Sequence, residues 1–145
     1  MIDRYSREVL KNIWSDYNKY SLWLKIEIAS AQAMEKYKII PKGVSKKVIK
    51  KAKINPKRIL EIEKKVKHDV IAFLTSITEK VGKEARYLHK GMTSSDVLDT
   101  CLNLQLKQSG EILVKDLDLL LSSIKKQANK HKFTICIGSC LLYTS

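Results

Sequence analysis

The stretch His89-Lys90-Gly91-Met92-Thr93-Ser94-Ser95-Asp96 decides how this chain folds, because a long segment of apolar periodicity begins directly after it. Thr93 and Asp96 have the spacing of a capping box, so we expect a helix to start there. Apolar residues then recur at helical steps, at Leu98, Leu102, Leu106, Leu113, Leu117, Leu120, Ile124 and Ala128. The pattern predicts one helix over Ser94 to about Asn129, roughly 54 Å long at 1.5 Å per residue. We expect such a helix to require partner helices of a bundle, which this chain does not supply.

The start of this helix is also a candidate anion-binding position. The first N–H groups of a helix have no partner within it, and the helix dipole adds about half a positive charge there. Gly91 permits a close approach of the backbone, and the hydroxyl groups of Thr93 and Ser94 add donors. The alternative interpretation is a capped helix without a ligand, and the spacing alone does not separate the two.

Composition places the chain in the all-α class. Among 145 residues there are only 5 Gly and 2 Pro, and the turn signals are correspondingly few. Asn55 and Pro56 predict a helix start with a side-chain cap and a proline in the first position, and Asp69 is a candidate cap for the next helix. Apolar periodicity predicts further helices within residues 3–14 and over residues 16–38, 44–53, 56–68 and 69–82.

The formal net charge of +13 is concentrated in one part of the chain. Residues 36–67 hold 13 Lys or Arg against Glu61 and Glu63, a local excess of +11. Base readout favours Arg, and stacking on bases needs interleaved aromatic residues, whereas this stretch is Lys-rich and has Tyr37 as its one aromatic. We therefore expect solvated helix faces that attract phosphorylated small molecules, and no specific nucleic-acid binding.

Neither a leader nor a membrane span is visible in the sequence. The first residues lack the apolar core of a signal peptide, and no apolar run approaches the roughly 18 residues of a membrane span. Cys101, Cys136 and Cys140 are odd in number and form no disulfide framework. Cys136 and Cys140 with His131 fall short of a four-ligand zinc set, so we expect no metal. These features favour a cytoplasmic location and no membrane partner.

Further segments carry a recognisable pattern. Besides His89 through Leu102 (HKGMTSSDVLDTCL), they are Arg4-Tyr5-Ser6-Arg7, Ile13-Trp14-Ser15 and His68 through Leu74 (HDVIAFL). In order and spacing, over roughly residues 1 to 132, the chain resembles the N-terminal part of the adenylosuccinate lyase family of the fumarase/aspartase superfamily. The resemblance implies a small N-terminal helical domain over 1–92 and the first helix of a central bundle over 93–132.

The resemblance also implies an activity. Members of the family cleave adenylosuccinate to AMP and fumarate, and likewise the related succinyl-carboxamide ribotide of purine synthesis, by β-elimination. A base removes a Cβ proton of the succinyl group while an acid protonates the departing nitrogen. No metal or organic cofactor takes part, and the family enzyme is a homotetramer with active sites assembled from three subunits.

Site residues follow from the matched motifs. Among the catalytic positions, His68 matches an auxiliary residue, and His89 lies in or beside the site. The substrate-binding positions that the resemblance implies are Arg4, Tyr5, Lys67, His68, Asp69, Thr93 and Ser94. An Arg suits phosphate because its planar fork donates two parallel hydrogen bonds, and a His changes its charge near neutral pH. Without the resemblance, an exposed Arg beside a Tyr and a capping His-Asp pair would be the ordinary interpretation.

The chain departs from the family pattern after Lys132. The Gly-Arg-Ser/Thr-His motif of the presumed general acid does not occur in residues 133–145, and the serine-bearing loop of the base is also missing. We therefore expect residues 133–145 to be a non-native or truncated tail, and the chain alone to be inactive. Two alternatives remain open: another superfamily lyase, such as one acting on argininosuccinate, and a basic helical module that binds nucleic acid.

Overall fold

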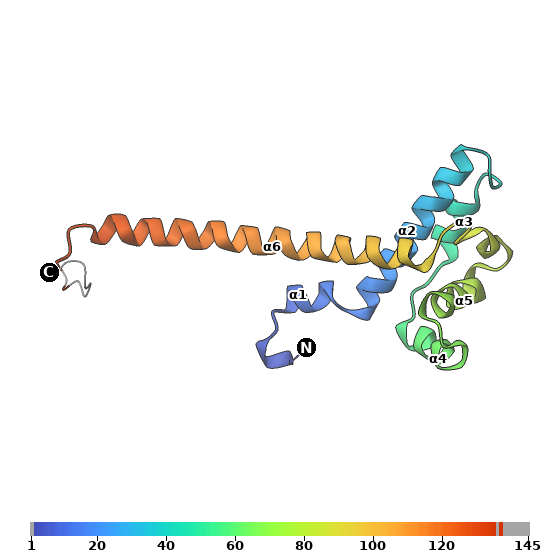
Figure 1. Cartoon of the computed structure of the whole chain (residues 1–145), viewed down its shortest axis with the longest axis horizontal. Coiled ribbons are helices and arrows are strands. Elements are labelled where there is room, and N and C mark those ends of the chain that lie inside the picture. The colour runs from blue at the N-terminus through green and yellow to red at the C-terminus, as the bar shows by residue number, and fades with distance from the viewer. Residues whose placement is uncertain (1, 136, 138–145) are drawn as a thin grey trace. The chain divides into compact units, whose positions relative to one another are not determined.

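The computed structural model describes residues 2–135 and 137, and these residues form helices, turns and short connections without a strand. This confirms the all-α class. The elements in chain order are η1 (Asp3–Tyr5), α1 (Glu8–Ile13), α2 (Asp16–Lys36), α3 (Val44–Lys51), α4 (Pro56–Val66), α5 (Asp69–Val81), η2 (Lys83–Tyr87) and α6 (Ser94–His131) (Figure 1).

The chain divides into two compact units, residues 1–109 and residues 110–145, and α6 contributes to both. The first unit holds the core and every candidate catalytic or substrate-binding residue. The second consists, as far as it is described, of the later part of α6 and the residues after it. In the part of the chain that the structure describes, no helix is both long enough and apolar enough to cross a membrane.

Local sequence signals set the helix starts. The Asn55 side chain accepts a hydrogen bond from the N–H of Arg58, with Pro56 in the first helical position, as predicted. Ser15 caps α2 in the same way by accepting from the N–H of Asn18. Gly43 precedes α3 with a φ of +89°, a conformation in which a side chain would be strained.

The core of the first unit is built around aromatic side chains from α2 and α5. Tyr20 and Trp23 meet edge to face with ring centroids 5.2 Å apart, and Phe73 lies edge to face with Trp23 at 5.4 Å. All three are fully buried. Because such ring pairs stabilise beyond the apolar area they bury, this cluster fixes α5 against α2.

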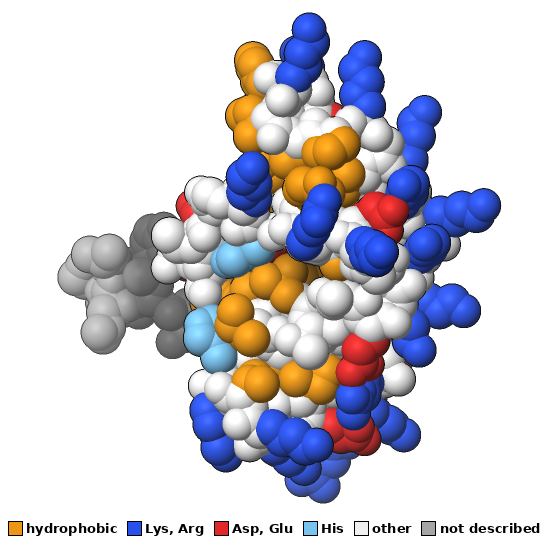
Figure 2. Space-filling model, turned by 90° about the vertical axis from the view of Figure 1, so that its right-hand side faces the viewer, with side chains coloured by type: hydrophobic (Ala, Val, Ile, Leu, Met, Phe, Trp, Pro, Cys, Tyr) orange, Lys and Arg blue, Asp and Glu red, His pale blue; other side chains and the backbone are white. Residues whose placement is uncertain are grey.

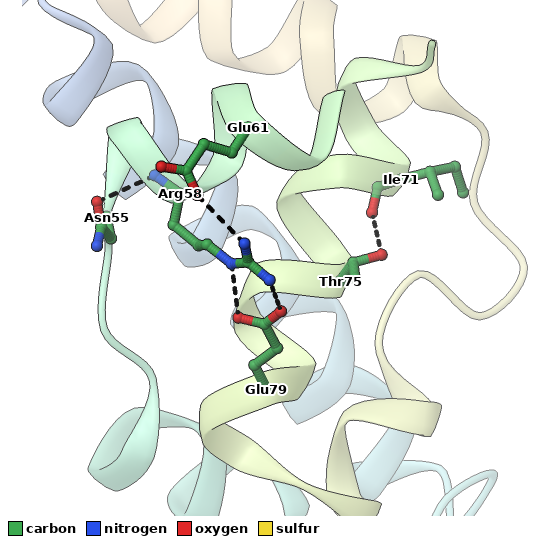
Figure 3. A network of polar contacts seen from close by, with 6 residues as sticks. All are labelled: Asn55, Arg58, Glu61, Ile71, Thr75 and Glu79. Carbon is green, nitrogen blue, oxygen red and sulfur yellow. Dashed lines mark hydrogen bonds and ion pairs between the residues drawn. The ribbon is translucent and has the colours of Figure 1, made fainter. Parts of the chain in front are cut away.

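Helices α4 and α5 form an antiparallel pair. At the end away from their connecting turn, an ion pair between Arg58 and Glu79 links them (Figure 3). Arg58 Nε lies 3.1 Å from Glu79 Oε2, and its Nη2 lies 2.6 Å from Oε1. A further bond runs from Arg58 Nη1 to Glu61 Oε2 at 3.2 Å. Because two parallel hydrogen bonds to Glu79 fix the direction of the contact, this ion pair also helps to orient the two helices.

The first turns of α6 pack through a face different from the predicted leucine stripe. The buried residues are Val97, Cys101 and Gln105, at steps of four, whereas Leu102 and Leu106 are 47% and 52% exposed. Gln105 Nε2 donates to the carbonyl oxygen of Ile13 at 2.8 Å. The polar Gln105 belongs to the buried face because it satisfies a backbone carbonyl, which apolar periodicity cannot reveal.

Candidate functional site

The turn between α4 and α5 carries the first candidate segment, Lys67-His68-Asp69. Lys67 ends α4 in the left-handed region, with φ 56° and ψ 31°, and its N–H donates to the carbonyl oxygen of Glu63 at 2.8 Å. This conformation reverses the chain and suits glycine better than lysine. Both Lys67 and His68 are exposed on the resulting turn.

The cap of α5 is His68, so the prediction of Asp69 as the cap is wrong by one residue. His68 Nδ1 accepts a hydrogen bond from the N–H of Ile71 at 3.4 Å. Asp69 is the first helical residue, and its Oδ1 accepts from the N–H of Val70 at 2.7 Å. The extended backbone of His68 places its ring over the helix end, which a residue already inside the helix cannot do.

The capping hydrogen bond determines which nitrogen of the His68 ring carries the hydrogen. A nitrogen that accepts a hydrogen bond carries no proton, so in this state Nδ1 is bare and Nε2 carries the hydrogen. The side chain is 47% exposed, which leaves Nε2–H available as a donor to a ligand. Nδ1 also lies 3.5 Å from Asp69 Oδ1.

A second candidate segment lies where η2 leads into α6. His89 has a φ of +58°, and its Nδ1 lies 2.7 Å from Oε1 of Glu27, a residue in the middle of α2. The His89 N–H donates to the other oxygen of the same carboxylate at 2.6 Å. The His89 side chain is 18% exposed, so this ring is held firmly while part of it still reaches solvent.

A capping box consists of two reciprocal hydrogen bonds, and the structure shows one of them between Thr93 and Asp96. Asp96 Oδ2 accepts a hydrogen bond from the N–H of Thr93 at 2.7 Å, and α6 begins at Ser94 as expected. Gly91 has a φ of +72° in the preceding turn. Because Asp96 already occupies one N–H donor, a bound anion would have to use the remaining donors of the first turn.

The third candidate segment, Arg4-Tyr5, lies in η1. The Arg4 guanidinium lies over the Tyr5 ring, 4.7 Å from its centroid, and both residues are exposed. The Ser6 hydroxyl donates to the carbonyl oxygen of Ile2 at 2.8 Å and closes the turn. The exposed Tyr5 ring therefore supports the planar Arg4 guanidinium, which retains its N–H donors.

The three candidate segments show local contacts but no polar or ring contact with one another among the described residues. Among the described residues, no hydrogen bond, ion pair or ring contact connects Arg4-Tyr5, Lys67-His68-Asp69 and His89 through Ser94. In a single copy of the chain the three candidate segments are therefore separate from one another. Figure 2 shows Lys and Arg around the face formed by α3, α4 and α5, with hydrophobic side chains between them. Electrostatic attraction to an anionic ligand is expected on this face.

The candidate metal ligands lie at the other end of the chain. Cys136 and Cys140 fall outside the residues that the structure describes. Among the described residues, no cluster of three or more His, Cys, Asp or Glu side chains could hold a metal ion.

Comparison with known proteins identifies the family. The sequence profile of a family described as Lyase matches residues 3–142 of this chain. The chain belongs to this lyase family.

Relatives of this chain include proteins named adenylosuccinate lyase. The chain is 45% identical over 138 residues to the one from Synechocystis sp. (strain ATCC 27184 / PCC 6803 / Kazusa). It is 43% identical over 138 residues to the one from Bacillus subtilis (strain 168). Each match covers 95% of this chain, which spans 32% of the length of each relative.

A solved structure shares the fold of this chain. The crystal structure of a fumarate lyase from Mesorhizobium sp. BNC1 superposes with a TM-score of 0.84 and covers 95% of this chain and 34% of that chain. The sequences are 20% identical, so this likeness concerns the helical architecture alone.

Sequence reasoning missed Glu27. This glutamate is 1% exposed and contacts a candidate residue 62 positions later in the chain. A signal was present in the sequence: Glu27 lies four residues after Trp23 and four before Ala31, in the middle of an apolar helix face. A carboxylate in such a row predicts a buried polar partner, because burial without one is costly.

Proposed function

We propose that this chain acts as part of an adenylosuccinate lyase, which eliminates fumarate from adenylosuccinate to leave AMP, and from the succinyl-carboxamide ribotide in the same way. The observation that carries the proposal is the 45% and 43% identity to two adenylosuccinate lyases over 138 residues. The exposed cationic and hydrogen-bonding groups of the candidate segments suit a substrate that bears a phosphate and carboxylates.

In this proposal the chain supplies binding and auxiliary groups. Arg4 and Tyr5 bind the nucleotide, with the guanidinium fork directed to phosphate. Lys67 adds a positive charge beside His68, whose Nε2–H donates to the substrate. Thr93 and Ser94 contact the substrate at the start of α6. The base that removes the Cβ proton and the acid that protonates the leaving nitrogen come from residues that this chain does not contain, and no metal or organic cofactor is needed.

The proposed assembly is a homotetramer in the cytoplasm, with each active site built from three subunits. Two observations support shared sites. The three candidate segments make no polar contact with one another among the described residues of one chain. In addition, α6 leaves large apolar side chains exposed along one face, at Leu113, Val114, Leu117, Leu120, Leu121 and Ile124. A face of this kind requires partner helices.

A chimera tests the proposed function. The matched segment of the Bacillus subtilis relative, 43% identical over 138 residues, would be replaced by the corresponding residues of this chain. Fumarate release would then be measured by absorbance with adenylosuccinate and, in parallel, with argininosuccinate. We expect release from adenylosuccinate only. A folded chimera that is inactive on adenylosuccinate, or that prefers argininosuccinate, would contradict the proposal.

The same chimera tests His68. We expect His68→Ala to lower kcat/KM by about 10- to 100-fold, the effect of losing one hydrogen bond to a charged group. The matched control is His131→Ala, because His131 lies at the end of α6 and outside the candidate segments. A fall in kcat with KM unchanged would assign His68 to the transition state, and a rise in KM alone to ground-state binding.

A further inference from the structure

The carboxylate of Glu27 is buried in the core of the first unit. It lies on α2 and is 1% exposed, on the same row as Trp23 and Ala31, which are also buried. Removing a carboxylate from water costs free energy unless hydrogen bonds replace the lost hydration. The partners of Glu27 therefore indicate what the buried charge does.

Both oxygens of Glu27 are used by one residue, His89. Oε2 accepts the backbone N–H at 2.6 Å, and Oε1 lies 2.7 Å from ring Nδ1. A carboxylate has no hydrogen to donate, so Nδ1 must carry the hydrogen in this contact. The remaining ring nitrogen, Nε2, is then left for another partner, and the side chain keeps 18% of its surface exposed.

We propose that Glu27 is a positioning residue that fixes the tautomer and the orientation of His89, so that Nε2 faces the substrate. Glu27 itself touches no substrate. The proposal deepens the proposed function, since it rests on His89 being part of that site. A purely structural role would need only the bond from Oε2 to the His89 N–H, which stabilises the left-handed turn at φ +58°.

The substitution Glu27→Gln separates the two roles. Gln has the same shape, and its carbonyl oxygen can still accept the His89 N–H. Its NH₂ group then faces Nδ1, so both contacts can be satisfied only if Nδ1 loses its hydrogen and Nε2 gains one. A structural role survives this change, whereas a positioning role does not, because the tautomer is inverted.

The first test uses this chain labelled with ¹⁵N-histidine and long-range ¹H–¹⁵N correlation spectra, which distinguish the tautomers. We expect a hydrogen on Nδ1 of His89 in the unsubstituted chain and the neutral Nε2–H tautomer in Glu27→Gln, with the His68 and His131 signals unchanged. Finding the Nε2–H tautomer in the unsubstituted chain would overturn the proposal, and this measurement stands even if the variant fails to fold. Circular dichroism checks the fold of the variant.

The second test measures fumarate release by the chimera. We expect Glu27→Gln to lower kcat/KM on the order of 10- to 100-fold, the loss seen when carboxylate partners of histidines are removed in metal sites. His89→Asn, which tolerates the left-handed backbone, should remove most of the effect of Glu27→Gln in the double variant. A folded Glu27→Gln chimera with an inverted tautomer and unchanged kinetics would overturn the proposal and leave the proposed function intact. An inactive parent chimera would count against the proposed function alone, because the tautomer is read independently of activity.

Discussion

The guanidinium of Arg58 and the carboxylate of Glu79 form a two-point pair, with N–O distances of 3.1 and 2.6 Å, at the end of the α4–α5 pair opposite to His68. Arg58 lies in the first turn of α4, and Glu79 lies in the last turn of α5 (Figure 3). The helices are thus tied at one end by charge and joined at the other by the turn that carries Lys67 and His68.

Replacing Arg58 tests this tie. We expect Arg58→Ala to lower the thermal midpoint of the chain modestly, because the pair is partly exposed and is screened by solvent. Arg58→Lys should recover only part of the loss, since an ammonium cannot form the two-point contact. Differential scanning calorimetry measures both, with Lys57→Ala as the neighbouring exposed control. Equal midpoints for Arg58→Ala and Lys57→Ala would show that the ion pair contributes nothing to stability.

The aromatic cluster should be far more sensitive. Phe73 is 0% exposed and contacts both Tyr20 and Trp23. We expect Phe73→Ala to reduce the free energy of unfolding by about 3–5 kcal/mol, the range for buried aromatic truncations. Phe73→Leu should cost less because it leaves a smaller cavity. Urea denaturation followed by circular dichroism gives both values, and a loss for Phe73→Ala no larger than that for Phe73→Leu would contradict this description of the core.

Glu35 should make the stability depend on pH. The Ser45 N–H donates to Glu35 Oε1 at 2.6 Å, and this bond lowers the pKa of Glu35 below its ordinary value of 4.5. A carboxyl with a lowered folded-state pKa contributes stability fully above the unfolded-state pKa and loses it as the pH falls through the folded-state pKa. We therefore expect the acid-induced loss of stability below about pH 4.5 to be smaller in Glu35→Gln.

Urea midpoints measured across pH 3 to 7, a range set around ordinary carboxyl pKa values of about 4, would test this expectation. Asp99→Asn is the control, because the Asp99 carboxylate has no hydrogen bond or ion pair to another described residue. If Glu35→Gln and Asp99→Asn show the same pH dependence as the unsubstituted chain, the bond to Ser45 carries no pH-dependent stability.

The exposed apolar side chains of α6 should drive self-association. Leu113, Leu117 and Leu120 are 51%, 62% and 55% exposed. We expect the chain to elute above its monomer mass of 16.6 kDa in light-scattering chromatography. Replacing these three leucines by Gln should shift it toward the monomer. The matched control places Ala at Ser122, Ser123 and Gln127. A monomeric unsubstituted chain would refute the expectation.

The sequence by itself determined the helical class and most helix starts and ends, because these depend on local signals. Asn55 and Pro56 open α4, Gly82 follows α5, and Ser94 begins α6, as predicted. Each of these depends on a few neighbouring residues and their backbone preferences. The family resemblance could be read for the same reason, since motifs are local strings of residues.

Tertiary structure alone decided which residues act together. The pairing of Glu27 with His89 joins residues 62 positions apart, and no local pattern specifies it. The buried face of α6 is also a tertiary property: Gln105 faces inward because the Ile13 carbonyl lies there, while the more apolar Leu102 and Leu106 stay exposed. Apolar periodicity in the sequence indicates which side chains favour burial. Packing geometry and the hydrogen bonds of polar groups decide which residues become partners in the folded chain.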